Sequence, residues 1–392
     1  MRRVIVAFCL GWAAIYADRT NLYPMLPIIG AEFGVSSAQA GALTSFYYLV
    51  YTAMQAPTGI IGDRVGLKRV LLITYTIAGL GMLGIGLFAR SYWLLGGLVA
   101  LHALGAGAYY TTAYATTMLT VPAHARGFSS AVINSGMALG LALGLATSGP
   151  IYLATQNWRV SFLLLGVPTL LLVPLFAWTL RDTRPRLSVS TGLREIIGDR
   201  QLLALDAAGF CSLYGFFVII TWAPTFFQNE RGLSLAVAGA FTAVVALAAL
   251  PAGMLLSRIS DRIGRRRITL ALFPLAAVAI YLVATVRTVE ALVAALLLYG
   301  LVGKLAWDPI AIAWVGDIAS RGKPDAVGSA IGVFSTCAIS AAVVGPVLSG
   351  WIRDVTGSLE GAFYLGAGVV ACGFLFALVP EETVARLARE RR

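Results

Sequence analysis

Long apolar stretches separated by short polar segments follow one another along the whole chain. A helix that rises about 1.5 Å per residue needs roughly 20 apolar residues to cross about 30 Å of hydrocarbon. The apolar runs are continuous rather than alternating, which predicts helices and no strands. Twelve spans are expected, at residues 4–29, 36–61, 70–89, 92–120, 128–154, 160–180, 202–228, 234–257, 268–286, 290–316, 326–350 and 361–380.

An Asp-Arg-x-Gly pattern follows the second expected span and, 198 positions later, the eighth. Its two copies are Asp63, Arg64 and Gly66, and Asp261, Arg262 and Gly264. Glycine permits a tight turn there. The Asp can accept a hydrogen bond from a helix N-terminus or pair with an Arg of a neighbouring helix, and such a contact can act as a gate that breaks and reforms. The repeat predicts two pseudo-symmetric six-helix bundles, residues 1–180 and 202–392, joined by a cytoplasmic linker at 181–201, with a substrate site between them.

Composition agrees with an all-α polytopic membrane protein, because 59% of the residues are hydrophobic and only 12% are charged. The net charge of +11 could indicate a nucleic-acid partner. However, 22 of the 29 Lys and Arg residues fall in segments on one side of the expected spans, which the positive-inside rule explains without a polyanion. We therefore expect a monomer in the cytoplasmic (inner) membrane, with lipid around it, no nucleic-acid partner and both termini cytoplasmic.

Charged side chains inside the expected spans are the first candidates for function, because each needs a partner or a wet cavity. In the first span, Arg19 shares a helix face with Tyr16, and a guanidinium fork suits carboxylate or phosphate. Asp18 lies about 100° around the helix from Arg19 and is expected to face another side, so it could exchange protons without contacting the ligand.

Lys304 and Asp308 form an i, i+4 pair in the tenth span, with Trp307 beside them. Lys304 and Trp307 are candidates for substrate binding, and Asp308 is a candidate for proton coupling. The alternative is that Lys304 and Asp308 form a local salt bridge that allows this helix to insert into the membrane. His102 could shuttle a proton or serve as a hydrogen-bonded packing residue.

Three stretches resemble the anion:cation symporters of the major facilitator superfamily, which include hexuronate, galactonate and phthalate permeases. They are Tyr16–Leu22, the stretch from Ser45 through Tyr51 and Gln55 to Arg64, and Tyr214 with Thr221–Phe227. The resemblance implies the major facilitator fold, a substrate anion clamped by Arg19, a site lined by Tyr51 and Gln55, and proton coupling through Asp18.

The chain departs from that family in its fourth span. An Arg and a Glu that are usual there fall here on Leu101 and Ala108. We hypothesise that Lys304 and Asp308 have taken over the missing charges.

The resulting expectation is a secondary transporter, not an enzyme, that takes up a small organic anion such as a carboxylate or sugar acid by alternating access. A proton, or alternatively sodium, is the expected coupling ion, and no cofactor is expected. The alternatives are an organic-anion or organophosphate exchanger, a drug or lipid efflux antiporter, and a transporter-like sensor. Ile151 after Gly149-Pro150, where drug antiport would favour a glycine-rich continuation, argues against efflux.

Overall fold

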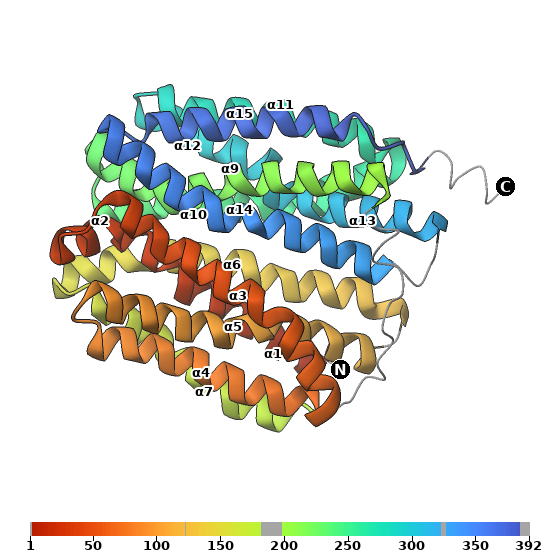
Figure 1. Ribbon diagram of the computed structural model, residues 1–392, viewed down its shortest axis with the longest axis horizontal. Coiled ribbons are helices and arrows are strands. Elements are labelled where there is room, and N and C mark those ends of the chain that lie inside the picture. The colour runs from red at the N-terminus through yellow and green to blue at the C-terminus, as the bar shows by residue number, and fades with distance from the viewer. Residues whose placement is uncertain (1, 122, 182–197, 323–326, 385–392) are drawn as a thin grey trace. The chain divides into compact units, whose positions relative to one another are not determined.

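The computed structural model describes residues 2–121, 123–181, 198–322 and 327–384, and within these ranges the chain forms helices and no strands (Figure 1). Most of the expected linker at 181–201 lies outside the described residues. The helices are α1 (Arg2–Thr20), α2 (Leu22–Phe33), α3 (Ser37–Val65), α4 (Leu67–Phe88), α5 (Tyr92–Thr120), α6 (Ala123–Thr155), α7 (Arg159–Thr179), α9 (Arg200–Arg231), α10 (Leu235–Ile263), α11 (Arg265–Thr285), α12 (Val289–Val302), α13 (Lys304–Gly322), α14 (Val327–Thr356) and α15 (Glu360–Ala377).

These helices account for the twelve expected spans. Ten helical segments in the described ranges are long and apolar enough to cross a membrane, with α12 and α13 counted as one. The other two spans are α1 continued by α2, and α3, which together hold most of the polar side chains discussed below. The expected class, an all-α membrane protein with twelve spans, is therefore confirmed.

The helices group into two compact units, each described here by itself. The first contains Met1–Leu187 and also Phe227–Ala243, which covers the end of α9 and the start of α10. The second contains Ser188–Phe226 and Val244–Arg392.

Two of the expected spans are interrupted. The first is divided at Asn21, just before Pro24 and Pro27, which lack the N–H that continues a helical ladder.

The tenth expected span is divided at Gly303, whose backbone is extended with φ −78° and ψ −165°. A Cβ at Gly303 would lie 2.9 Å from a ring carbon of Tyr299, so a side chain does not fit at this break. At the equivalent place in the first half, Gly105 lies inside the continuous helix α5 and packs on α4.

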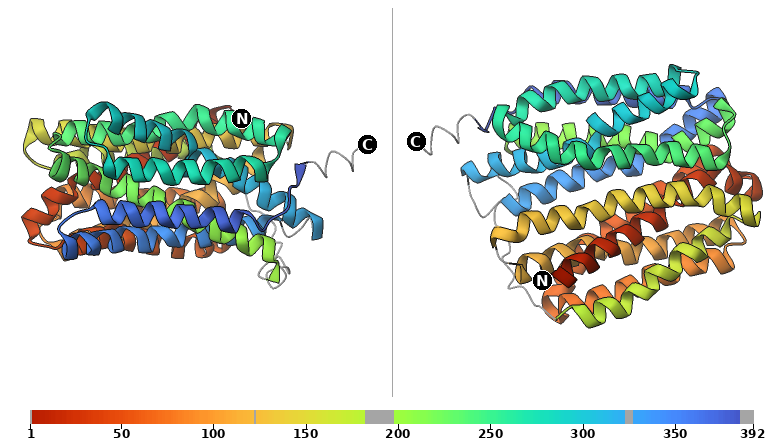
Figure 2. Two further views of the ribbon diagram at one scale, coloured as in Figure 1. Left: turned by 90° about the horizontal axis from the view of Figure 1, so that it is seen from above. Right: turned by 180° about the vertical axis from the view of Figure 1, so that it is seen from behind.

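A stripe of glycines on α6 brings this helix into main-chain contact with α1. In the rear view of Figure 2, α1, in red, lies beside α6, in yellow. A Cβ on any of the three glycines would collide with the backbone of α1; the pairs are Gly136 with Cys9, Gly140 with Ala13, and Gly144 with Ala17. Small residues spaced four apart allow this close approach in membrane helices. The contact fixes the position of α1, which holds Asp18 and Arg19.

The duplicated loops adopt the same backbone conformation. Gly66 between α3 and α4 has φ 104° and ψ 135°, and Gly264 between α10 and α11 has φ 116° and ψ 139°. Both angles lie in the region that favours glycine over any residue with a Cβ. The sequence repeat is therefore also a repeat of backbone geometry.

A polar clasp joins three segments at one end of the first unit. The Arg159 guanidinium binds both carboxylate oxygens of Glu32 and donates to the Ala89 carbonyl, with 2.8 Å between Arg159 Nε and Ala89 O. The Trp158 indole donates to Glu32 over 2.6 Å. Burial raises the pKa of Glu32, but the hydrogen bonds from Arg159 and Trp158, together with the Arg159 charge, outweigh burial and hold this pKa below its ordinary value.

Replacing Gly264 with Ala should lower the thermal unfolding midpoint of the purified protein. The alanine backbone would have to keep a positive φ, which costs about 1–2 kcal/mol, and the new methyl group would also meet the Glu382 carboxyl group. Gly332→Ala in α14 is the matched control, because nothing lies within 4 Å of its Cβ position and Ala favours a helix. Equal midpoints for both variants would contradict the interpretation of this loop.

Neutralising Glu32 should remove a pH-dependent part of the stability. The folded-state pKa of Glu32 is lowered. Its contribution to the free energy of unfolding is therefore fully present above the ordinary pKa of 4.5 and is lost as the pH falls through the folded-state pKa. Glu32→Gln should thus lower the unfolding midpoint at pH 7, and the difference from wild type should shrink below about pH 4.5. Thermal scans between pH 3 and pH 7 would measure this, with the exposed Glu290→Gln as control. A difference independent of pH would argue against the clasp.

Candidate functional site

The centre of the first unit holds a buried arginine enclosed by tyrosine rings. Arg19 on α1 is 7% exposed, and its guanidinium carbon lies 3.4 Å from the ring centre of Tyr16 on the same helix face. Tyr48 and Tyr51 of α3 have their ring centres at 5.2 Å and 5.9 Å. Aromatic faces attract a cation. In the part of the chain that the structure describes, no carboxylate lies within ion-pair distance of Arg19, so its positive charge is not neutralised.

A small cavity lies beside this arginine, between α1, α2, α3, α4, α5 and α7. Its volume is about 20 Å³, and its polar lining includes Asp18, Arg19, Thr44, Tyr47 and His102. A space of about 10–15 Å³ is enough for one water molecule. Several buried polar atoms here have no hydrogen-bond partner among the described residues; they are Asp18 Oδ1, Arg19 Nε, Thr44 Oγ1 and His102 Nε2. Polar atoms without partners thus surround a space large enough for one water molecule.

The side chain of Asp18 is directed toward α7. Its Oδ2 accepts a hydrogen bond of 2.7 Å from Thr169 of α7, and the residue is fully buried. It nevertheless lines the same cavity as Arg19. The contact with α7 agrees with the expectation that Asp18 lies about 100° around the helix from Arg19, although both residues border the cavity.

His102 on α5 also reaches the cavity. Its Nδ1 lies 3.1 Å from the Ala78 carbonyl of α4, and its ring centre lies 5.6 Å from that of Tyr47. One ring nitrogen is thus anchored, and the other, Nε2, has no hydrogen-bond partner among the described residues. Gln55 lies on α3, one turn beyond Tyr51, and is half-buried.

The second unit holds the other expected charges at the start of a helix. Lys304 is the first residue of α13, directly after the break at Gly303, and its Nζ lies 3.2 Å from Asp308 Oδ2. The first N–H groups of a helix and a lysine there form a positive region that attracts anions.

Two aromatic residues lie near this helix start. The buried Tyr299 hydroxyl has no hydrogen-bond partner within the described ranges. Trp307 is 2% exposed and donates to Thr269 Oγ1 over 3.0 Å, so it packs in the core of this unit.

Two buried polar residues were not expected as site residues. Asn21 at the interruption of the first span is fully buried, and neither side-chain atom has a partner among the described residues. Asp206 on α9 is 5% exposed. Its position inside the span expected at 202–228 was the signal that could have identified it. No group of three His, Cys, Asp or Glu side chains in the described chain could hold a metal ion.

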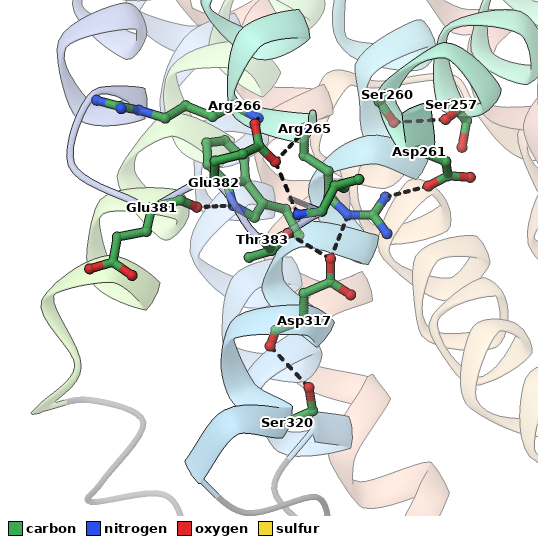
Figure 3. Close-up of polar contacts among 12 residues, drawn as sticks. Ser257, Ser260, Asp261, Arg265, Arg266, Asp317, Ser320, Glu381, Glu382 and Thr383 are labelled. Atoms are coloured by element: carbon green, nitrogen blue, oxygen red, sulfur yellow. Dashed lines mark hydrogen bonds and ion pairs between the residues drawn. The ribbon is translucent and has the colours of Figure 1, made fainter. Parts of the chain in front are cut away.

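The second copy of the duplicated loop belongs to a polar network at one end of the second unit (Figure 3). Arg265 pairs with Asp261 at 3.0 Å and, through Nε, with Asp317 of α13 at 2.6 Å. The Glu382 carboxylate accepts from the backbone N–H groups of Arg265 (2.9 Å) and Arg266 (3.1 Å) at the N-terminus of α11. Arg262 and Arg64 are exposed, and the side chain of Asp63 lies outside the described residues.

The segment after α15 ties this network together. Thr383 donates to Asp317 over 2.8 Å, the Trp314 indole donates to the Glu381 carbonyl over 3.0 Å, and Gln201 of α9 accepts from the Glu381 N–H over 2.9 Å. The ends of α9, α11 and α13 are thereby held by one short stretch of chain.

Known proteins similar to this chain are transporters. A family model described as "Major Facilitator Superfamily" matches residues 8–303 and 205–392. The "Probable sulfoacetate transporter SauU" of Cupriavidus necator is 28% identical, over 96% of this chain and 92% of that protein. The "Hexuronate transporter" of Bacillus subtilis is 27% identical, over 93% and 91%. The crystal structure of a D-xylose-proton symporter shares the fold with a TM-score of 0.76 at 18% identity, covering 97% of this chain and 98% of that one.

Truncating Glu382 should destabilise the protein more than truncating its neighbour. Glu382→Ala removes the cap of α11, and a lost cap typically costs about 1 kcal/mol. Glu381→Ala removes an exposed ion pair with Arg321, with 3.3 Å between the charged atoms, and such pairs contribute little. Thermal unfolding of both variants in detergent should show a measurably lowered midpoint for Glu382→Ala alone. The reverse order would contradict the capping role.

Proposed function

Because this chain belongs to the major facilitator superfamily, we propose that it is a secondary transporter of a small organic anion, with carboxylates and sugar acids first, and that it works by proton-coupled symport. The observation that carries this proposal is the buried, unneutralised guanidinium of Arg19 among tyrosine rings. A charge inside a membrane protein is costly unless it finds a partner. An anionic ligand supplies that partner.

The chemistry of the Arg19 surroundings favours an oxyanion. A guanidinium offers several N–H donors in a planar fork that matches a carboxylate. The Thr44 hydroxyl beside it supplies a further donor without a partner among the described residues. Sulfoacetate and hexuronate, the compounds in the names of the two similar transporters, are both organic anions, and this supports the same class of substrate.

Proton coupling is supported by two titratable groups beside the arginine. Asp18 and His102 line the cavity that Arg19 lines, and each has one polar atom without a partner in the described chain. A proton on either group changes the charge that the substrate anion meets, because all three side chains share one low-dielectric space. The loading of the proton and of the anion would thus depend on each other.

The second unit contributes a positive region of its own to the proposal. Lys304 at the start of α13 attracts an anion, and Asp308 compensates the lysine while no anion is near. We further propose alternating access through movement of the two units, with both termini on the cytoplasmic side of the inner membrane. The bias of 22 of the 29 basic residues to one side supports this orientation.

Replacing Arg19 should abolish stabilisation by ligands. Sulfoacetate, glucuronate and tartrate are the first anions to test, and a ligand at about 100 times its dissociation constant adds about 2.7 kcal/mol of stability. At least one of them should raise the unfolding midpoint of the wild type by several degrees. Arg19→Ala should lose this shift, and Arg19→Lys should keep only part of it because the fork is gone.

Arg64→Ala removes an exposed arginine and serves as the matched control, which should keep the full shift. An equal shift in Arg19→Ala and the wild type would remove Arg19 from the binding site.

A further inference from the structure

An additional carboxylate lies inside a membrane span of the second unit. Asp206 is on α9, six residues after the first residue of this helix, and it is 5% exposed. It is the one acidic residue between Arg200 and Gln228. The proposed mechanism so far makes no use of it.

The surroundings of Asp206 offer it neither a cation nor a hydrogen bond. Among the described residues, none lies within ion-pair or hydrogen-bond distance of its carboxylate. The titratable group that interacts with it is the Cys337 thiol of α14. One turn further along α9, a Cβ at Gly209 would lie 2.6 Å from the Phe334 ring, so α9 and α14 pack closely here. This part of α9 is therefore covered by α14.

The other two membrane carboxylates have partners that favour their charged form. Asp308 is 3.2 Å from the Lys304 ammonium, and Asp18 accepts a hydrogen bond of 2.7 Å from Thr169. An ion pair or a donated hydrogen bond stabilises a carboxylate. Asp206, which is 5% exposed, has neither among the described residues. In the second unit, Lys304 thus compensates the charge of Asp308, and no described residue does the same for Asp206.

We propose that Asp206 is a second proton-binding site of this transporter, located on α9 in the second unit. Its carboxylate takes up one proton to form an O–H bond, which removes the buried negative charge, and it releases the proton when water reaches it; no other reactant is needed. The inference rests on the proposed proton-coupled function. It assigns to Asp206 the coupling role that the sequence alone suggested for Asp308.

Transport in proteoliposomes tests the coupling role. Radiolabelled glucuronate, sulfoacetate and tartrate would be offered to the full chain, with a pH gradient and without sodium. Asp206→Asn should take up the anion no faster with the gradient than without it, while exchange against the same anion inside continues. Asp206→Glu keeps a titratable group and should retain gradient-driven uptake. Glu290→Gln, an exposed carboxylate on α12, is the matched control and should behave like the wild type.

Infrared difference spectra between acidic and neutral pH test proton binding without any substrate. The wild type and Asp308→Asn should show a protonated-carboxyl band that is weaker in Asp206→Asn. If the band is equal in Asp206→Asn and the wild type, the proposal is overturned, whether or not any of the three anions is transported. If the wild type shows gradient-driven uptake and Asp206→Asn shows the same, Asp206 has no coupling role, and the proposed transport function still stands.

Discussion

The cost of holding a charge away from water governs the arrangement of this protein. Each charged group within the spans meets that cost in a different way. Lys304 and Asp308 neutralise each other across one helical turn, and Asp18 receives a hydrogen bond from Thr169. Arg19 lies against the faces of tyrosine rings and, among the described residues, has no carboxylate at ion-pair distance, so its compensation is weaker than a carboxylate would give. The compensation at Arg19 is therefore weaker than that of the Lys304–Asp308 pair.

The two halves of the chain share a framework but differ where the chemistry lies. Gly66 and Gly264 have nearly the same backbone angles, so the duplicated loops repeat one turn. Gly105 and Gly303 also correspond in sequence, yet the first lies in a continuous helix and the second breaks one. The break places Lys304 at a helix start, and the continuous helix places His102 beside Arg19. An ancestral repeat thus accommodates two unlike polar sites.

The twelve spans, the duplicated loops and the charged residues followed from the sequence because hydropathy and charge act locally. The interruption at Gly303 did not follow, since a glycine in an apolar run is compatible with a helix until the Tyr299 ring lies across it. The orientation of Asp18 depends on α7, which is distant in sequence. The cap of α11 by Glu382 joins segments more than 100 residues apart, and no local pattern reports such a contact. Asp206 was overlooked because a carboxylate near a span end usually reaches water, whereas here α14 covers it.

The glycine stripe between α1 and α6 bears on how this site can change during evolution. Main-chain contact at Gly136, Gly140 and Gly144 sets the depth at which α1 lies, and therefore the position of Arg19. A substitution to alanine at one of these glycines would push α1 outward by about the width of a methyl group, since packed interiors yield little. The ligand preference could then shift although every residue touching the ligand is unchanged. Homologues with identical residues around Arg19 can thus differ through the small residues of a neighbouring helix.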